Sequence, residues 1–349
     1  MERKQTRQVK IGPLFIGGQA PVTVQSMTNT DTRDIEATAA QILGLQEAGC
    51  DIARISVYDT ECANAIPAIK KMVSIPLVAD IHFDHRLAIQ AAKNGIDKIR
   101  INPGNIGSEL KIRELAACVK DLGIPIRVGA NSGSLKEEYL DKYGVSARAM
   151  VESALEQVSI LERQGFCDIV ISLKASDVAM TVESYRMASR ITDYPLHIGV
   201  TEAGFGDIGK IRCAVGLGTL LLEGIGDTLR VSLSGDPVQE VTTGREILKS
   251  CGLLQEGVDI ISCPTCGRCR SDIESIARSV YEHTRGITRP LKVAVMGCAV
   301  NGPGEARHAD VGVACGDGKG VIFCHGEILT TVTEKEIVKT LLDIIRDYH

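Results

Sequence analysis

One sequence unit recurs along the first two thirds of the chain and limits the possible folds more than any other feature. In each copy a helical stretch ends near a glycine, a short polar step follows, and an apolar run comes next. Clear copies lie at 47–57, 93–105, 163–176 and 222–235. Glycine suits the end of a helix because it accepts the left-handed conformation, and the β-branched run is typical of a buried strand. The repeat therefore predicts a modular fold of alternating helices and strands.

Apolar runs of strand length occur eight times in this region, and helical patterns separate them. One helical pattern near 34–48 places Ile35, Ala39, Ile42 and Leu43 on one face. Eight strands that alternate with helices predict a (β/α)8 TIM barrel over residues 1–250. An open doubly wound sheet is the alternative, which the lack of a GxGxxG motif after the first run disfavours. The runs are 22–27, 51–57, 76–82, 98–102, 125–130, 168–173, 195–200 and 228–233.

The pattern changes after a helix and a polar connection at 255–257. Strands are expected at 258–262, 292–296, 311–314 and 321–323, with a helix at 272–282. A last helix opens with Thr333 and Glu336, which have the spacing of a capping box. Ile337, Leu341 and Ile344 give that helix one apolar stripe. Residues 258–349 are therefore expected to form a separate small α/β domain.

Composition excludes several classes of protein. A formal charge of −5 argues against a nucleic-acid-binding protein that works through bulk positive charge. No apolar run approaches the ~20 residues of a membrane span, and residues 1–10 are charged and lack the apolar segment of a signal peptide. We expect a cytoplasmic protein with no membrane or nucleic-acid partner. Thiols stay reduced there, so the 12 cysteines indicate metal or redox chemistry for a few of them.

Charged residues concentrate in and after the expected strands, whose carboxyl ends carry the active sites of β/α barrels. Cations inside apolar strands are costly unless they are paired or bind a ligand. Some of them could pair with Asp80, Glu202 or Asp236 and only stabilise the barrel. Because four cations come from different strands, we favour an anion site, since guanidinium groups match phosphate oxygens. The four cations are Arg54, Arg100, Arg127 and Lys174.

Cysteine spacing predicts a metal or iron–sulfur centre in the C-terminal domain. Cys263, Cys266 and Cys269 follow one expected strand as CxxCxxC, and Cys298 follows another. Soft thiolates select zinc or iron–sulfur clusters, and a tetrahedral zinc site is the competing interpretation. From spacing alone, Cys269 is the natural fourth ligand. The other candidates are Cys315, Cys324, His308 and Glu305, which follows a Gly-Pro-Gly turn.

Seven segments carry a resemblance to a known family. They are VQSMTNTDT (24–32), VADIHFD (78–84), RINPGN (100–105), HIGVTEAG (197–204), RVSLSGDP (230–237), SCPTCGR (262–268) and GCAVNGPGEA (297–306). They closely resemble the bacterial 4-hydroxy-3-methylbut-2-enyl diphosphate synthases of the non-mevalonate isoprenoid pathway. The resemblance covers essentially the whole chain, and the last two segments together are highly specific.

The resemblance implies a TIM barrel followed by a domain with one 4Fe-4S cluster. It implies reductive ring opening and dehydration of 2-C-methyl-D-erythritol 2,4-cyclodiphosphate, with flavodoxin or ferredoxin as the electron donor. The four cations named above would neutralise the diphosphate, and Asn131 and Ser232 would add hydrogen bonds. The implied cluster ligands are Cys263, Cys266, Cys298 and Glu305.

Glu202 is the expected proton donor for the hydroxyl that leaves as water. It follows a strand among apolar residues that would favour its protonated form, although a salt bridge to Lys174 is the other interpretation. The linker between the two domains is short, and the resemblance implies a head-to-tail homodimer in which each cluster domain covers the partner's barrel. Two other functions compete: a pteridine-binding barrel such as dihydropteroate synthase, and a non-catalytic zinc scaffold or iron–sulfur carrier.

Overall fold

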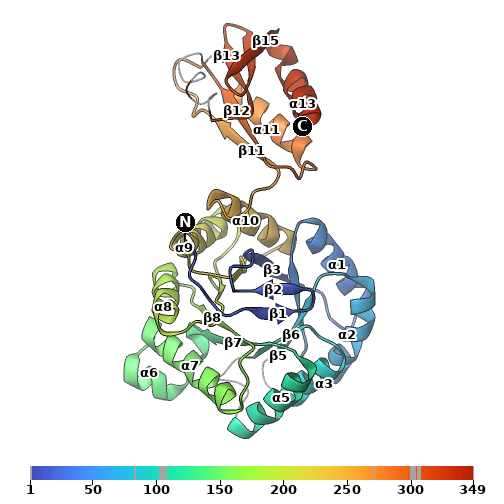
Figure 1. Cartoon of the computed structure of the whole chain (residues 1–349), viewed down its shortest axis with the longest axis vertical. Coiled ribbons are helices and arrows are strands. Elements are labelled where there is room, and N and C mark those ends of the chain that lie inside the picture. The colour runs from blue at the N-terminus through green and yellow to red at the C-terminus, as the bar shows by residue number, and fades with distance from the viewer. Residues whose placement is uncertain are drawn as a thin grey trace. The chain divides into compact units, whose positions relative to one another are not determined.

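The computed structural model divides the chain into two compact units, Met1–Leu253 and Leu254–His349 (Figure 1). Residues 2–81, 84–101, 108–269, 271–298, 304 and 308–348 are described. Among these residues, no helix has both the length and the apolar composition that a membrane crossing requires.

The first unit is a parallel β/α barrel, which confirms the fold predicted from the repeat (Figure 1). Its strands are hydrogen-bonded in the order β8-β7-β6-β5-β4-β3-β10-β9. A parallel bridge between Ile171 and Leu196 links β8 to the residue just before β9, so the ring is nearly closed. The strands are β3 (Thr23–Met27), β4 (Ile52–Ser56), β5 (Leu77–Ile81), β6 (Lys98–Ile101), β7 (Ile126–Asn131), β8 (Ile169–Lys174), β9 (His197–Ile198) and β10 (Thr228–Leu229).

Strands β9 and β10 are shorter than their apolar runs indicated, with two residues each. Carboxylates take the place of ladder partners nearby. The Asp227 carboxylate accepts a hydrogen bond from Leu196 N–H at 2.9 Å, and the Glu240 carboxylate accepts one from Leu233 N–H at 3.1 Å. An apolar run therefore overestimates strand length where side chains satisfy the backbone.

Helices cover the outside of the barrel, and most begin at a well-formed cap. Ala39 and Ile42 of α1 are buried as expected, but Leu43 is 39% exposed and does not belong to that face. Carboxylates accept hydrogen bonds from first-turn N–H groups at Asp34, Asp59, Asp84, Asp177 and Asp236. The helices are α1 (Ile35–Glu47), α2 (Thr60–Met72), α3 (His85–Lys93), α5 (Glu109–Leu122), η1 (Ser132–Ser134), α6 (Glu137–Tyr143), α7 (Ala147–Arg163), α8 (Val178–Ile191), α9 (Gly206–Leu222) and α10 (Pro237–Ser250).

A short hairpin closes the amino end of the barrel. Strands β1 (Val9–Ile11) and β2 (Leu14–Ile16) pair antiparallel. The buried side chains of Ile11 and Ile16 pack with Ile52 and Val78 from the first residues of β4 and β5. Sequence analysis missed this hairpin because three-residue strands are too short for an alternating pattern to stand out. The polar residues at the carboxyl ends of the strands lie at the opposite end of the barrel.

The second unit is an α/β domain around a five-stranded sheet of order β11-β12-β13-β14-β15. The first three strands are parallel, and the last two pair antiparallel. Two helices pack on the sheet through a core that includes Ile276, Val293, Val313 and Leu341. The elements are β11 (Val258–Ser262), α11 (Ile273–Thr284), β12 (Leu291–Met296), β13 (Val311–Gly316), β14 (Lys319–Cys324), β15 (Glu327–Thr333), η2 (Glu334–Glu336) and α13 (Ile337–Asp347).

The capping box expected before the last helix is present. Thr333 N–H donates to Glu336 Oε2 at 3.1 Å, at the start of the 3₁₀ turn that leads into α13. Strand β15 was not predicted. Six of its seven residues are exposed, so this edge strand has no buried face to produce an apolar alternation.

Candidate active site

Charged side chains fill the barrel interior. Arg100 on β6 is the register partner of both Asp80 on β5 and Arg127 on β7. Lys174 ends β8 beside Asn131, the last residue of β7. The structure brings together the four predicted cations and buries all of them, with exposed fractions from 1% to 8% for Arg54, Arg100, Arg127 and Lys174.

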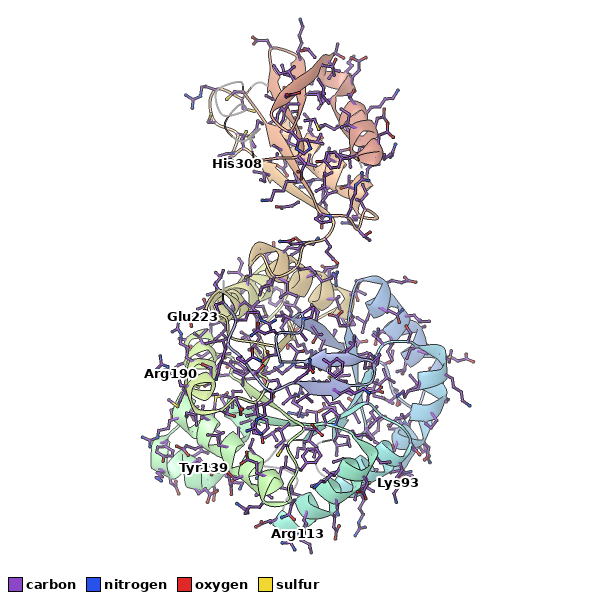
Figure 2. All side chains as sticks on the ribbon, in the orientation of Figure 1. Lys93, Arg113, Tyr139, Arg190, Glu223 and His308 are labelled. Carbon is purple, nitrogen blue, oxygen red and sulfur yellow. The ribbon has the colours of Figure 1, made fainter. Side chains whose placement is uncertain are left out.

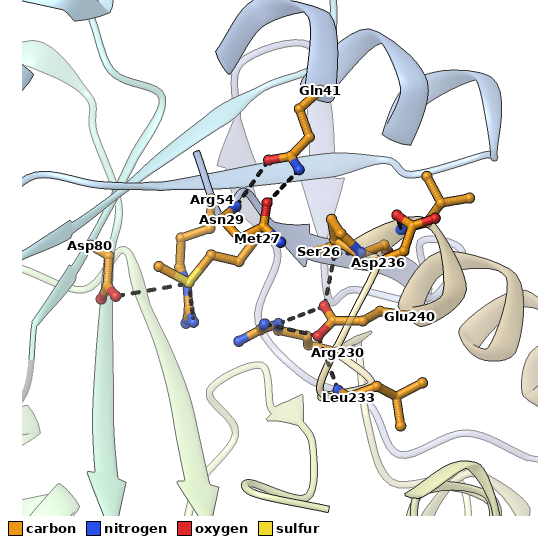
Figure 3. Close-up of polar contacts among 12 residues, drawn as sticks. Ser26, Met27, Asn29, Gln41, Arg54, Asp80, Arg230, Leu233, Asp236 and Glu240 are labelled. Atoms are coloured by element: carbon orange, nitrogen blue, oxygen red, sulfur yellow. Dashed lines mark hydrogen bonds and ion pairs between the residues drawn. The ribbon is translucent and has the colours of Figure 1, made fainter. Parts of the chain in front are cut away.

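Asp80 balances part of this charge. Its Oδ1 accepts a hydrogen bond from Arg100 Nη1 at 2.9 Å, and its Oδ2 lies 3.9 Å from Arg54 Nε. The guanidinium of Arg54 also contacts Met27 Sδ, at 3.0 Å from Nε and 2.8 Å from Nη2 (Figure 3). Arg54 and Arg100 thus have a structural role in addition to any role in binding.

A further cation, Arg230, is held by Glu240. Its Nε and Nη2 donate to the two carboxylate oxygens at 3.2 and 3.1 Å (Figure 3). The same carboxylate accepts from Ser26 Oγ at 2.8 Å and from Leu233 N–H at 3.1 Å. This paired arginine fixes the segment after β10, which contains Ser232.

Arg127 and Lys174 are compensated much less. Nε and Nη1 of Arg127 are buried and have no hydrogen-bond acceptor among the described residues. Within the same part of the chain, no carboxylate lies at ion-pair distance from Lys174 Nζ. Glycines make room for these long side chains: a Cβ at Gly199 would lie 2.7 Å from Lys174 Nζ, and one at Gly129 would lie 3.6 Å from Arg100 Nε.

Burial and mutual repulsion disfavour the charged forms of these cations. Burial lowers the pKa of Arg54 to about 9. It also lowers the pKa of Arg127 and that of Lys174 well below their usual values, and neighbouring arginines lower both further. An anion with several charges, bound among these groups, reverses that effect because it stabilises each cation. The interior is therefore electrostatically suited to a phosphate or diphosphate.

Three buried polar residues of this interior were missed in the sequence. Lys98 Nζ donates to Gln25 Oε1 at 3.3 Å, and His197 Nδ1 lies 3.4 Å from Thr228 Oγ1. Burial, followed by the nearby Arg127, lowers the pKa of His197 well below its usual value, so its ring is neutral. A signal was available for Lys98: it stands two residues before Arg100 on the same strand, and residues two apart share a face.

The remaining predicted residues of the barrel differ in exposure. Asn131 and Ser232 are half-buried, after β7 and β10 respectively. Glu202 is exposed and lies between β9 and α9 with a φ of +52°. The left-handed turn separates Glu202 from its buried neighbours Val200 and Ala203. The apolar surroundings expected for this carboxyl are therefore absent.

The cysteine loop begins where β11 ends. Gly297 N–H, directly after β12, donates to Cys263 Sγ at 3.1 Å, and Cys298 is the next residue. Because β11 and β12 pair in parallel, Cys263 and Cys298 lie at the same end of the sheet. Cys266 is exposed, and a hydrogen bond from the backbone of Arg268 lowers its pKa. A groove of about 480 Å³ borders this loop, lined in part by Cys263, Thr265 and Tyr281.

Cys269, the ligand favoured by spacing, lies beside Cys263. A Cβ at Gly297 would be 2.5 Å from Cys269 Sγ and 3.1 Å from Cys263 Sγ, so both sulfur atoms border the same glycine. Cys269 Sγ also donates to Ser271 O at 3.1 Å. Glu305, the implied fourth ligand, lies outside the described residues.

The donor chemistry of this loop fits an iron–sulfur cluster. Its thiols are soft ligands, and the lowered pKa of Cys266 favours the thiolate form that binds metal. Among the described residues, no three His, Cys, Asp or Glu side chains converge closely enough to hold one metal ion. A cluster contributes its own iron and sulfide atoms, so it can join thiolates that are too far apart to share a single ion.

Fold and site together define a TIM-barrel protein with a buried polycationic interior and a second domain that carries a cysteine loop. Residues 6–245 match the family described as the GcpE TIM-barrel domain, and residues 259–347 match the GcpE protein C-terminal domain. The chain belongs to the GcpE family.

Curated relatives extend this similarity over nearly the whole chain. A protein of Caldanaerobacter subterraneus subsp. tengcongensis is 58% identical over 97% of this chain and 96% of its own length. One from Clostridium perfringens is 57% identical over 99% of each. Both are named 4-hydroxy-3-methylbut-2-en-1-yl diphosphate synthase (flavodoxin).

Solved structures resemble the barrel alone. Dihydropteroate synthase from Stenotrophomonas maltophilia matches 70% of this chain and 97% of its own, with a TM-score of 0.52 and 15% identity. The enzyme from Yersinia pestis covers the same shares, with a TM-score of 0.50 and 10% identity. At such low identity the likeness shows a shared fold and carries no information about the reaction.

Proposed function

We propose that this chain is an iron–sulfur oxidoreductase of isoprenoid biosynthesis by the non-mevalonate pathway. It converts 2-C-methyl-D-erythritol 2,4-cyclodiphosphate to 4-hydroxy-3-methylbut-2-enyl diphosphate. Relatives named for this product share 57% and 58% of its residues. The observation that carries the proposal is the barrel interior, where the buried guanidinium of Arg127 has N–H donors without acceptors among the described residues.

The barrel residues bind and orient the diphosphate. Arg127 and Lys174 are its main contacts because they are the cations with least compensation from acidic groups. Arg54 and Arg100 contribute charge while they keep Asp80 in place. Asn131 and Ser232, half-buried after β7 and β10, donate hydrogen bonds that fix the orientation of the substrate.

Glu202 supplies the proton for the hydroxyl that leaves. The reaction takes up two electrons and two protons, the ring C–O bond breaks, and one water departs. A carboxyl exposed between β9 and α9 can regain its proton from solvent after each turnover. Its left-handed backbone holds the side chain at the loop that follows β9.

Cys263, Cys266, Cys298 and Glu305 hold one 4Fe-4S cluster in the domain 258–349, while residues 1–250 bind substrate. When bound, the cluster supplies the electrons, which come from flavodoxin, as in the relatives' name, or from ferredoxin. A head-to-tail homodimer brings each cluster domain to the partner's barrel.

Metal analysis of anaerobically purified protein tests the cluster. Iron and acid-labile sulfide in equal amounts, with negligible zinc, are expected. Glu305→Ala should change the visible spectrum or the lability of the cluster and leave substrate affinity intact. Zinc without sulfide would instead identify the zinc scaffold, and turnover without any metal would favour a cluster-free barrel enzyme.

A further inference from the structure

Helix α9 is apolar on two opposite faces. Its inner face packs on the barrel through buried residues that include Cys213, Leu217 and Leu220. On its outer face, four aliphatic side chains are more than half exposed: Ile208 (56%), Ile211 (62%), Val215 (55%) and Leu222 (57%). A helix that is hydrophobic all round is normally covered on every side. Figure 1 shows α9 at the outside of the barrel, and it packs between α8 and α10.

The exposed residues form a single stripe. At about 100° per residue, Ile208, Ile211, Val215 and Leu222 fall within an arc of roughly 60°. The positions between them are Ala214, Gly218 and Thr219, which are small or uncharged. The charged residues Asp207 and Arg212 lie at the margins of the stripe. An exposed apolar patch of this kind marks a contact surface.

The stripe is symmetric about its centre. Ile208 stands seven residues before Val215, and Leu222 stands seven residues after it. Two copies of α9 that cross antiparallel at Val215 therefore place Ile208 of each against Leu222 of the other. Ile211 then faces the small residues Gly218 and Thr219 of the other copy. A seven-residue spacing is that of packed helix pairs, and a two-fold interface must be self-complementary in this way.

We propose that the outer face of α9 is the two-fold interface with a second copy of this chain, centred on Val215. This inference deepens the homodimer of the proposed function and rests on it. A permanent apolar contact is the appropriate occupant because electron-transfer partners form small, transient interfaces that depend on charge. Charges are confined to the ends of the stripe, where Glu223 (Figure 2) pairs with Arg186.

This interface also positions the proposed proton donor. Helix α9 follows the loop that contains Glu202, and Phe205 in that loop is 69% exposed. Arg212, on the first turns of α9, donates to Ala203 O at 3.1 Å, and Ser234 N–H donates to Gly204 O at 3.0 Å. A partner seated on α9 fixes its first turns and, through these bonds, the loop. Glu202 is thus expected to depend on the dimer for its position.

Sedimentation of the anaerobic holoprotein tests the interface. The wild type should have twice the chain mass of 37.4 kDa. Val215→Arg should weaken association roughly 30-fold or more, since charge at the centre of an interface removes its best-packed contact. Ile191→Arg is the matched control, because Ile191 ends α8 with 59% exposure on the outside of the same barrel. It should sediment like the wild type, and circular dichroism should show both variants folded.

A second variant tests the symmetry. With Val215→Cys, two introduced thiols meet at the axis, and diamide should join them by taking up two electrons and two protons. Mass spectrometry should then find the peptide around 215 linked to itself, which Ile191→Cys should not show. A monomeric wild type, or Val215→Arg that dimerises normally, would overturn the interface. These readouts need neither substrate nor turnover, so the proposed function can stand if the interface fails.

Discussion

Replacement of Arg127 by methionine is expected to move stability and substrate affinity in opposite directions. The side chain is 1% exposed, two of its N–H groups lack acceptors among the described residues, and cations surround it. A buried donor without a partner costs about 1–3 kcal/mol. Methionine retains the volume of the stem and removes the charge, so the free energy of unfolding should rise by about 1–3 kcal/mol.

Substrate binding should respond in the other sense. Loss of one charge-assisted contact with phosphate costs about 1.5–3 kcal/mol, which weakens affinity roughly 10- to 150-fold at 25 °C. Calorimetric titration of the oxidised, non-turning-over protein with the cyclodiphosphate measures affinity, and urea unfolding followed by circular dichroism measures stability. Arg190→Met is the control, because Arg190 is exposed on α8 at the outside of the barrel (Figure 2). If Arg127→Met bound substrate as tightly as the wild type and were less stable, Arg127 would be a structural cation.

Three further changes test separate parts of the account. Cys298→Ser should abolish the visible absorbance of the cluster, whereas Cys118→Ser on α5 should retain it; full iron content in the first variant would remove Cys298 from the ligand set. Glu202→Gln should slow turnover roughly 10²–10⁴-fold with iron content and substrate affinity nearly intact, and a wild-type rate would exclude it as the acid. For His197, burial lowers the folded-state pKa well below 6.5, so the unfolded chain takes up the proton first and stability falls as pH drops below about 6.5. The slope is at most about 1.4 kcal/mol per pH unit. Urea unfolding of wild type and His197→Gln between pH 5 and 7.5 should show the flatter profile for the variant; parallel profiles would argue against a neutral, buried ring.

Features that repeat along the chain could be predicted from sequence. The glycine-then-apolar unit predicted the barrel because each helix ends and each strand starts by the same local rule. The cations on different strands could be grouped because parallel strands bring their carboxyl ends to one place, which the buried set around Arg127 and Lys174 illustrates. The capping box at Thr333 and Glu336 was readable because it is local.

Features that depend on tertiary context could not be predicted. The hairpin of β1 and β2 leaves no periodic signal in three-residue strands, and only its packing on Ile52 and Val78 stabilises it. Glu202 was expected among apolar side chains because its sequence neighbours are buried, but a left-handed turn exposes it. The pairing of Arg230 with Glu240 and of Arg100 with Asp80 needs the folded geometry.

The ratio of electrons consumed to product formed tests the central claim most directly. Reduced flavodoxin is mixed anaerobically with the protein and the cyclodiphosphate, its oxidation is followed by absorbance, and the product is quantified by mass spectrometry. The account predicts two electrons per 4-hydroxy-3-methylbut-2-enyl diphosphate, and neither oxidation nor product with Cys298→Ser. Product formed without oxidation of the donor, or by the Cys298→Ser protein at the wild-type rate, would contradict a cluster-dependent reduction at this barrel.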